Sequence, residues 1–360
     1  MSVSSVTVTS PHVWAESEVE RQLTNKVIEV MQNIARVNMS NTNLDTGVHY
    51  PLPYVKALQS AGGEKLQERL KTFKEYGMSY HGYASPNYFK MVSDQGSPSG
   101  KKVMTFVLKS GVKPSEALEK LESGLSILGC GETCQVAQYR AILDVLGVEK
   151  FDALFAGDSS TPLIISGTHP QNPISKLRNY ICKTEANLNE VRRGDLIHFS
   201  NAGSYQEKHP IGASQGYNSI CMHEAGESSR FTALGWPSEG LHYGEIQMVM
   251  RSEYNTDPVN TREVLSDKIG RQIPKPQTKW LAKQITPAEF TKEDGGKIQI
   301  VCQLDTKRIT ALANSTLAEA RALLDSYKVR KGPRIVLATG SEMKTRMPAP
   351  DAVVSSTTES

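Results

Sequence analysis

A helical pattern followed by a series of short strand patterns constrains the fold of this chain more than any other feature. Residues 131–146 place Val136, Tyr139 and Leu143 on one stripe of a helix, and Gly147 follows as a C-terminal stop. Four strand-like segments separated by turn-forming residues come next, at residues 195–200, 218–224, 230–236 and 241–250. Consecutive short strands favour an antiparallel sheet packed against the helix. We therefore expect an α+β fold.

Further patterns flank this central part. Apolar residues recur with a helical period over residues 15–37, residues 103–108 read as a strand, and Pro114 lies where the first turn of a helix is expected. Near the other end, Thr316 and Glu319 have the spacing of a capping box at the start of a helix. Additional patterns predict a helix at residues 66–76 and strands at residues 88–92, 297–304 and 334–338.

Composition divides the chain into four parts. Residues 1–14 and residues 347–360 are rich in small polar residues, and we expect both to be disordered. Residues 15–254 begin with an N-terminal helical extension and then carry the predicted helix and sheet. The pattern changes after Tyr254, where several prolines mark loops. We expect residues 255–346 to form an α/β extension of the core or a small second domain.

The composition also limits the class of function. The 360 residues include 41 Lys and Arg against 38 Asp and Glu, and this net charge of +3 does not favour nucleic-acid binding. No run approaches the ~20 apolar residues that span a bilayer. The first 14 residues lack the basic and apolar regions of a Sec signal peptide. We expect a soluble protein, either cytoplasmic or secreted without a Sec signal peptide; the sequence indicates no oligomeric state.

One of the five cysteines has special surroundings. An odd, scattered set does not resemble a disulfide framework, so we expect reduced thiols. Cys130 lies between two glycines, directly before the helix predicted at residues 131–146. The unpaired N–H groups of a helix start favour an anion, which lowers the pKa of a thiol and makes it nucleophilic. The alternative interpretation of Cys130 is a small buried apolar residue. We interpret the other four as structural: Cys134, Cys182, Cys221 and Cys302.

A nucleophilic thiolate needs an imidazole or another base beside it. The predicted sheet carries His198, His223 and His242, and the last of these opens the segment at residues 241–250, from which its side chain can point toward the helix start. No spacing of Cys and His resembles a zinc site, and neither a P-loop nor a GxGxxG fingerprint is present. We expect neither a metal ion nor a cofactor.

The order and spacing of these segments resemble the bacterial spore-coat protein-glutamine gamma-glutamyltransferases of the papain-like NlpC/P60 superfamily. The resemblance covers about residues 88–250. It rests on Cys130 at the head of a helix, on the sequence Gly-Val-Glu-Lys-Phe at residues 147–151, and on Gly194-Asp195 opening a strand. It implies a papain-like core in which the nucleophile-bearing helix packs on an antiparallel sheet, with N- and C-terminal extensions.

The family's other catalytic groups are a glutamate at the start of one strand and a histidine on the next, and two alignments place them differently. In the first alignment, residues 218–222 form the first strand and residues 230–236 the second. The glutamate's position then falls near Tyr217 and the histidine's position falls on Ala233. This alignment implies a protein without the catalytic apparatus.

The second alignment takes residues 230–235 as the first strand. The histidine's position then falls on His242, and Glu227 lies two residues before the glutamate's position at Ser229, on the same strand face. We prefer this alignment because it keeps a histidine where a thiolate needs one.

The resemblance implies cysteine-dependent acyl transfer on protein glutamine carboxamides, as a transglutaminase or a deamidase. Cys130 would form a thioester, His242 would act as base and acid, and Glu227 would orient it. The backbone N–H groups of Cys130 and Gly131 would bind the oxyanion. The implied partner is a protein that offers glutamine and lysine side chains. The alternatives are a papain-like thiol amidase or peptidase, and a catalytically inactive binding protein on the same fold.

Overall fold

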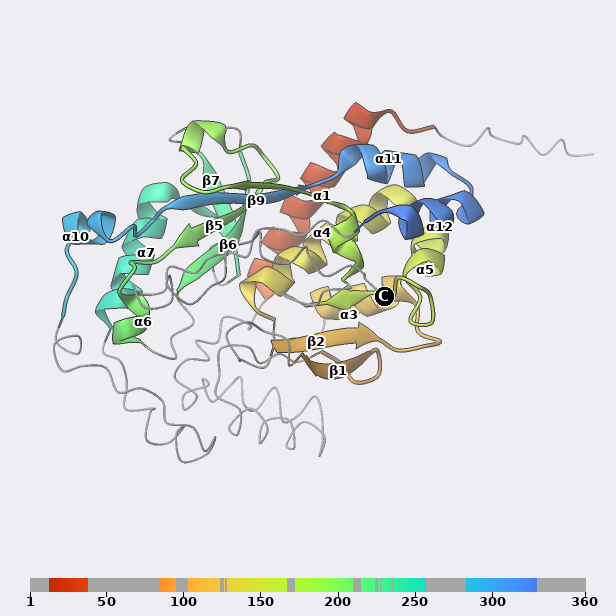
Figure 1. Cartoon of the computed structure of the whole chain (residues 1–360), viewed down its shortest axis with the longest axis horizontal. Coiled ribbons are helices and arrows are strands. Elements are labelled where there is room, and N and C mark those ends of the chain that lie inside the picture. Colours follow the sequence, from red (N-terminus) through yellow and green to blue (C-terminus); the bar gives the residue numbers. More distant parts are fainter. Residues whose placement is uncertain are drawn as a thin grey trace, which may run out of the picture.

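The computed structural model describes residues 13–37, 84–94, 103–123, 126, 128–166, 172–209, 215–223, 226, 228–234, 236–256 and 283–328. These residues form two sheets and a set of helices, and α4 (Cys130–Leu146) contacts both sheets (Figure 1). The expected α+β class is confirmed. The predicted helix at residues 66–76, the predicted strand at residues 334–338, the tail at residues 347–360 and most of residues 1–14 lie outside the described residues.

The larger sheet has six strands in the order β4-β9-β5-β6-β7-β8, and every neighbouring pair is antiparallel. The strands are β4 (Arg178–Lys183), β9 (Ile298–Leu304), β5 (Leu196–Ser200), β6 (Gly216–Cys221), β7 (Arg230–Ala233) and β8 (Leu241–His242). Strand β9 comes from the part of the chain that we expected to be an extension or a second domain. It lies inside the sheet, between β4 and β5, so this part of the chain completes the sheet.

Both faces of this sheet are buried. Leu196 and Ile220 belong to the same hydrophobic cluster as α4 and α1 (Glu16–Val37), whereas Ile197 and Phe199 pack with α7 (Tyr243–Asn255). Successive side chains of a strand point to opposite faces. Helices α4 and α1 therefore cover one face of the sheet, and α7 covers the other (Figure 1).

The smaller sheet comprises β1 (Phe89–Asp94), β2 (Val103–Leu108) and β3 (Ile164–Ile165). Helices α3 (Pro114–Ser123) and α5 (Val148–Phe155) pack against α4 beside it. The ring of Tyr139 on α4 makes edge contacts with Phe155, at 5.6 Å between centroids, and with Phe151, at 6.4 Å. Its hydroxyl donates to Asn172 Oδ1 at 3.0 Å, so this fully buried side chain is also hydrogen-bonded.

The C-terminal helices are tied to the core through Lys150. Its Nζ donates to the carbonyl oxygens of Leu312, Ala313 and Ser315 at 3.2, 2.6 and 2.7 Å. These carbonyls end α11 (Thr306–Asn314), where a cation is favourable. The remaining elements are η2 (Pro173–Lys176), η3 (Leu188–Glu190), α6 (Tyr205–Lys208), α10 (Pro287–Lys292) and α12 (Leu317–Ser326), and the capping box predicted for α12 is confirmed.

One predicted strand is wrong. Of residues 241–250, only Leu241 and His242 pair with β7, and α7 begins at Tyr243. Glu245 accepts a hydrogen bond from the backbone N–H of His242 at 2.8 Å and thereby closes the first helical turn. Ile246 and Met250, four residues apart, are both fully buried on one face of the helix. This spacing of four residues is the helical signal in a segment that we predicted to be a strand.

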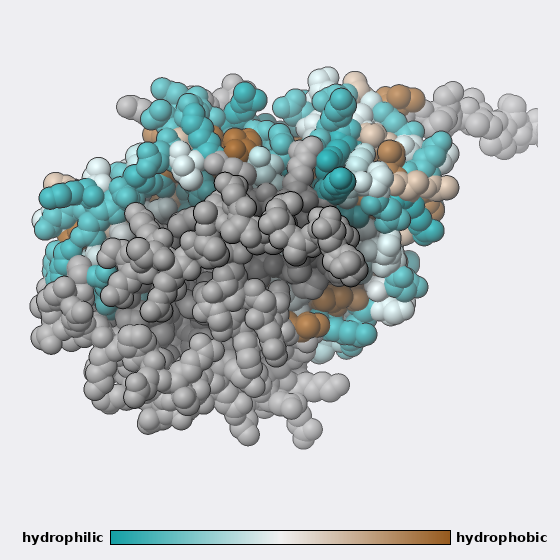
Figure 2. Space-filling view, viewed as in Figure 1, coloured by the Kyte–Doolittle hydropathy of each residue, from teal (hydrophilic) through white to brown (hydrophobic). Residues whose placement is uncertain are grey.

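Hydrophilic side chains dominate the described surface in Figure 2. The large apolar side chains that are exposed come from separate parts of the fold: Val13, Val92, Val148, Ile181, Met248 and Leu317. None of the described helices is long and apolar enough to cross a membrane.

Candidate functional site

Cys130 is the first residue of α4, which begins one residue before the helix predicted at residues 131–146. Gly129 before it has extended backbone, and its carbonyl accepts from both the backbone N–H and the hydroxyl of Thr133, each at 2.9 Å. The side chain of Cys130 is half-buried, whereas the free thiols of Cys134, Cys221 and Cys302 are buried. The side chain of Cys182 lies outside the described residues. Among the described thiols, Cys130 is therefore the one open to a reactant.

The sulfur of Cys130 contacts the larger sheet through Asn218 on β6. Asn218 Nδ2 donates a hydrogen bond to Cys130 Sγ at 3.3 Å. A Cβ at Gly131 would lie 3.4 Å from Asn218 Nδ2, so the first turn of α4 is in van der Waals contact with this side chain. The strand that contacts the first residue of α4 is thus β6, and the side chain of this strand next to the thiol is an amide.

His198 on β5 lies behind this amide. The β5–β6 register pairs His198 with Asn218, and His198 Nδ1 is 3.2 Å from Asn218 Oδ1. His198 is only 3% exposed, and its Nε2 has no hydrogen-bond partner in the described part of the chain. Its ring lies against Gly216, where a Cβ would come within 2.5 Å of it. The structure therefore connects Cys130, Asn218 and His198 by two consecutive hydrogen bonds.

The electrostatics of the thiol differ from the expectation for a helix start. Burial raises the pKa of Cys130 above its ordinary value, and the carboxylate of Glu132 adds to the increase. Hydrogen bonds from Asn218 and from the backbone of Gly131 act in the opposite direction without cancelling it. The expected lowering of the Cys130 pKa is thus wrong, because desolvation outweighs the hydrogen bonds.

His198 is neutral at physiological pH. Burial lowers its pKa to about 4, and the hydrogen bond with Asn218 only partly offsets this. The amide of Asn218 and a neutral imidazole, rather than an imidazolium, are therefore the polar groups that the sheet places near Cys130.

His242 lies at the edge of the same sheet, with β7 between it and β6. It pairs with Arg230, which lies level with Met222, four residues along β6 from Asn218. For a strand spacing of ~4.8 Å and a rise of ~3.3 Å per residue, the Cα atoms of His242 and Asn218 are about 16 Å apart. The structure does not bring His242 next to the thiol.

The other residues of the two alignments are placed as follows. Glu227 lies outside the described residues, so the catalytic roles of Glu227 and His242 stay predictions. The strand beside Cys130 is β6, the first strand of the first alignment; Tyr217 precedes Asn218 on it, and Ala233 pairs with Ser219.

Sequence reasoning missed Asn218 and gave His198 no role. The available signal was the strand pair itself. Two antiparallel segments at residues 195–200 and 218–224, connected in the right register, place residues 198 and 218 opposite one another. A short turn fixes the register of two strands. The connection between residues 200 and 218 is long, so the sequence does not fix the register of this pair.

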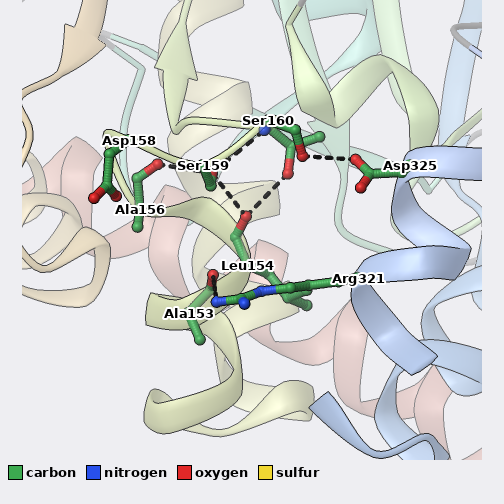
Figure 3. Close-up of a pocket in the computed structure, with 9 residues that line it drawn as sticks. Ala153, Leu154, Ala156, Asp158, Ser159, Ser160, Arg321 and Asp325 are labelled. Carbon is green, nitrogen blue, oxygen red and sulfur yellow. Dashed lines mark hydrogen bonds between the residues drawn. The ribbon is translucent and has the colours of Figure 1, made fainter. Parts of the chain in front are cut away.

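A separate pocket lies between the end of α5, the loop after it and α12 (Figure 3). Ser160 Oγ donates to Asp325 Oδ1 at 2.7 Å across it, and Arg321 donates to the carbonyl of Ala153 at 3.2 Å. None of its lining residues belongs to α4 or β6, so it is not part of the Cys130 site. Among the described residues, no group of three or more His, Cys, Asp or Glu side chains is arranged to hold a metal ion.

No family model matches this chain, and no curated protein sequence matches it. Among solved structures, the chain is similar to a transglutaminase from Geobacillus stearothermophilus without its C-terminal extension. The two chains share 13% identity over 82% of this chain and 95% of that chain, with a TM-score of 0.43. Similarity at this level assigns neither a family nor an activity.

Proposed function

We propose that this chain is a cysteine-dependent acyltransferase that acts on protein glutamine carboxamides, with Cys130 as its nucleophile. The observation that carries the proposal is a half-buried thiol at the first residue of a 17-residue helix, with Asn218 and the backbone of Gly131 hydrogen-bonded to its sulfur. Donors at that position stabilise both a thiolate and the oxyanion formed on an acyl group. A helix bearing this thiol and packed on an antiparallel sheet also supports the papain-like NlpC/P60 core that the sequence resembles.

The proposed reaction has two steps. The sulfur of Cys130 bonds to the carboxamide carbon, the C–N bond breaks, and ammonia leaves with the thiol proton. A lysine amine or water then attacks the thioester and returns a proton to the sulfur. The products are an isopeptide crosslink or a glutamate side chain. The N–H groups of Cys130 and Gly131, at the open end of α4, would bind the oxyanion in both steps.

The proton acceptor forms a separate part of the proposal. The proposal assigns the general base to His242 and its orientation to Glu227, although β7 lies between β8 and the strand that contacts Cys130. A base at His242 requires β8 to move relative to α4, because proton transfer needs hydrogen-bond reach. Unchanged activity in His242→Ala would assign proton transfer to another group.

The proposal predicts that Cys130→Ser abolishes acyl transfer, with a loss of about a thousandfold or more, because the thioester cannot form. Incorporation of a labelled primary amine into a glutamine-bearing protein, measured together with ammonia release, tests this. Cys134→Ser, one helical turn further along α4, is the matched control and keeps its activity. Equal amine incorporation by the wild type and Cys130→Ser would contradict the proposal. Release of a new amino terminus in place of ammonia would indicate a thiol peptidase.

A non-catalytic binding protein on this fold is the second candidate. It is favoured by the raised pKa of Cys130 and by the amide that occupies the position next to the sulfur. Iodoacetamide alkylation at neutral pH discriminates the two, because the thiolate is the reactive form. A Cys130 that reacts no faster than free cysteine, together with no amine incorporation, would favour the binding protein.

A further inference from the structure

The side-chain amide of Asn218 accepts a hydrogen bond from His198 and donates one to Cys130. The carbonyl oxygen Oδ1 can only accept, so the proton that it shares with His198 belongs to the ring nitrogen Nδ1. This fixes the neutral tautomer of His198 with a lone pair on Nε2. With Oδ1 held by the ring, the amide group of Asn218 is left facing Cys130 and donates to the sulfur.

The arrangement is built into the sheet. His198 and Asn218 are opposite residues of β5 and β6, and they face α4 together with Leu196 and Ile220. Gly216, two residues before Asn218 on the same face, leaves the volume that the imidazole fills, since a Cβ there would lie 2.5 Å from Cε1 and Nε2. The ring is thereby held against the amide, and the amide against the thiol.

Burying an imidazole with one unpaired nitrogen costs free energy, and another interaction must offset that cost. Nε2 of His198 has no partner among the described residues, and a buried polar atom without a partner destabilises the folded state. A structural role in a core would be served better by an apolar ring at this position. The hydrogen bond that His198 does make is directed at Asn218, the residue that contacts Cys130.

We infer that Asn218 and His198 are positioning residues for Cys130: the imidazole N–H of His198 locks the side-chain amide of Asn218 so that its N–H donates to the sulfur. The inference rests on the proposed role of Cys130 as a nucleophile. The amide donor stabilises the negative charge that develops on sulfur and fixes the direction of the Cβ–Sγ bond. His198 acts through Asn218 and accepts no proton from the thiol.

The pH profile of Cys130 alkylation by iodoacetamide tests the inference, with the Cys130 peptide quantified by mass spectrometry. Asn218→Asp keeps the shape but exchanges the N–H donor for a carboxylate. We expect the alkylation midpoint to rise by at least one pH unit, which corresponds to about tenfold slower alkylation at neutral pH. Asn218→Ser removes the donor without adding charge, and we expect a smaller shift in the same direction.

His198→Phe removes the imidazole N–H that holds the amide while keeping an aromatic ring, and we expect it to raise the midpoint as well. Because His198 acts only through Asn218, the double variant Asn218→Ser/His198→Phe should shift the midpoint no further than Asn218→Ser alone. His209→Phe is the matched control: His209 is also a buried histidine, but its Nε2 contacts the carbonyl oxygen of Tyr254 at 2.9 Å. It should leave the midpoint unchanged.

An unchanged midpoint in His198→Phe, or shifts of the two single variants that add in the double variant, would overturn the inference. Thermal unfolding of each variant identifies those that fold. The alkylation measurement does not require acyl transfer, so the inference can fail while Cys130→Ser still abolishes amine incorporation. Conversely, if Cys130→Ser retains amine incorporation, the proposed function fails whatever the alkylation profile shows.

Discussion

A chain truncated after Thr256 is expected to lose cooperative folding altogether. Truncation removes β9 from the middle of the larger sheet, which leaves β4 without its partner strand and exposes one edge of β5. It also removes buried apolar side chains: Phe290, Ile298, Ile300, Val301, Ile309, Leu312 and Leu324. At about 1.5 kcal/mol for each of these, the loss is roughly 10 kcal/mol. Typical total stabilities are only about 5–15 kcal/mol.

Thermal unfolding followed by circular dichroism measures this effect. The matched control is a chain that ends after Lys328, which keeps every described element, and it should unfold cooperatively like the full chain. A cooperative transition in the chain that ends at Thr256 would show instead that residues 15–254 fold as an independent domain.

The free energy of unfolding is expected to decrease as the pH falls from about 6.5 to about 4, in part because of His198. The pKa of His198 is lowered by burial to about 4 in the folded protein, against ~6.5 in an unfolded chain. Between these values the unfolded state binds more protons, so acidification favours unfolding. A difference of about 2.5 pKa units corresponds to about 3 kcal/mol, lost progressively across this window.

Urea unfolding at a series of pH values tests this prediction through the slope rather than the absolute stability. His198→Gln removes the titrating ring, and its free energy of unfolding should change about 3 kcal/mol less than that of the wild type between pH 6.5 and 4. Some slope should remain, because burial also lowers the pKa of His209. Parallel curves for the wild type and His198→Gln would show that His198 does not titrate in the expected range.

The sequence predicts well those elements whose signals are local. The start of α4 at Cys130, the proline-led α3 and the capping box of Thr316 and Glu319 are all confirmed, because propensity and capping act over a few residues. The strand prediction for residues 241–250 fails because the segment is short and its apolar residues fit both a strand and a helical period. The side chain of Glu245, which closes the first helical turn, favours the helix.

The candidate site was less predictable because its parts meet through tertiary structure. Cys130 carries a local signal, a thiol at a helix start. Asn218 and His198 acquire their positions from the pairing of β5 with β6 and from the packing of α4 on that pair. Chemistry alone favoured a histidine beside the thiol, whereas the structure places an amide there. The rise in the pKa of Cys130 is likewise a property of burial, which the spacing of residues does not reveal.

The position of β9 has a consequence for how the protein forms during synthesis. Tyr180 on β4 pairs with Cys302 on β9, so the sheet closes only after nearly the whole described chain has left the ribosome. Until then, the edge of β5 that pairs with β9 has unpaired backbone groups, and Lys150 lacks the carbonyls that it binds at the end of α11. Contacts between distant residues slow folding and prolong the exposure of unpaired strand edges. The nascent chain is therefore expected to depend on protection from aggregation until β9, the last of the described strands to emerge, completes the sheet that carries His198 and Asn218.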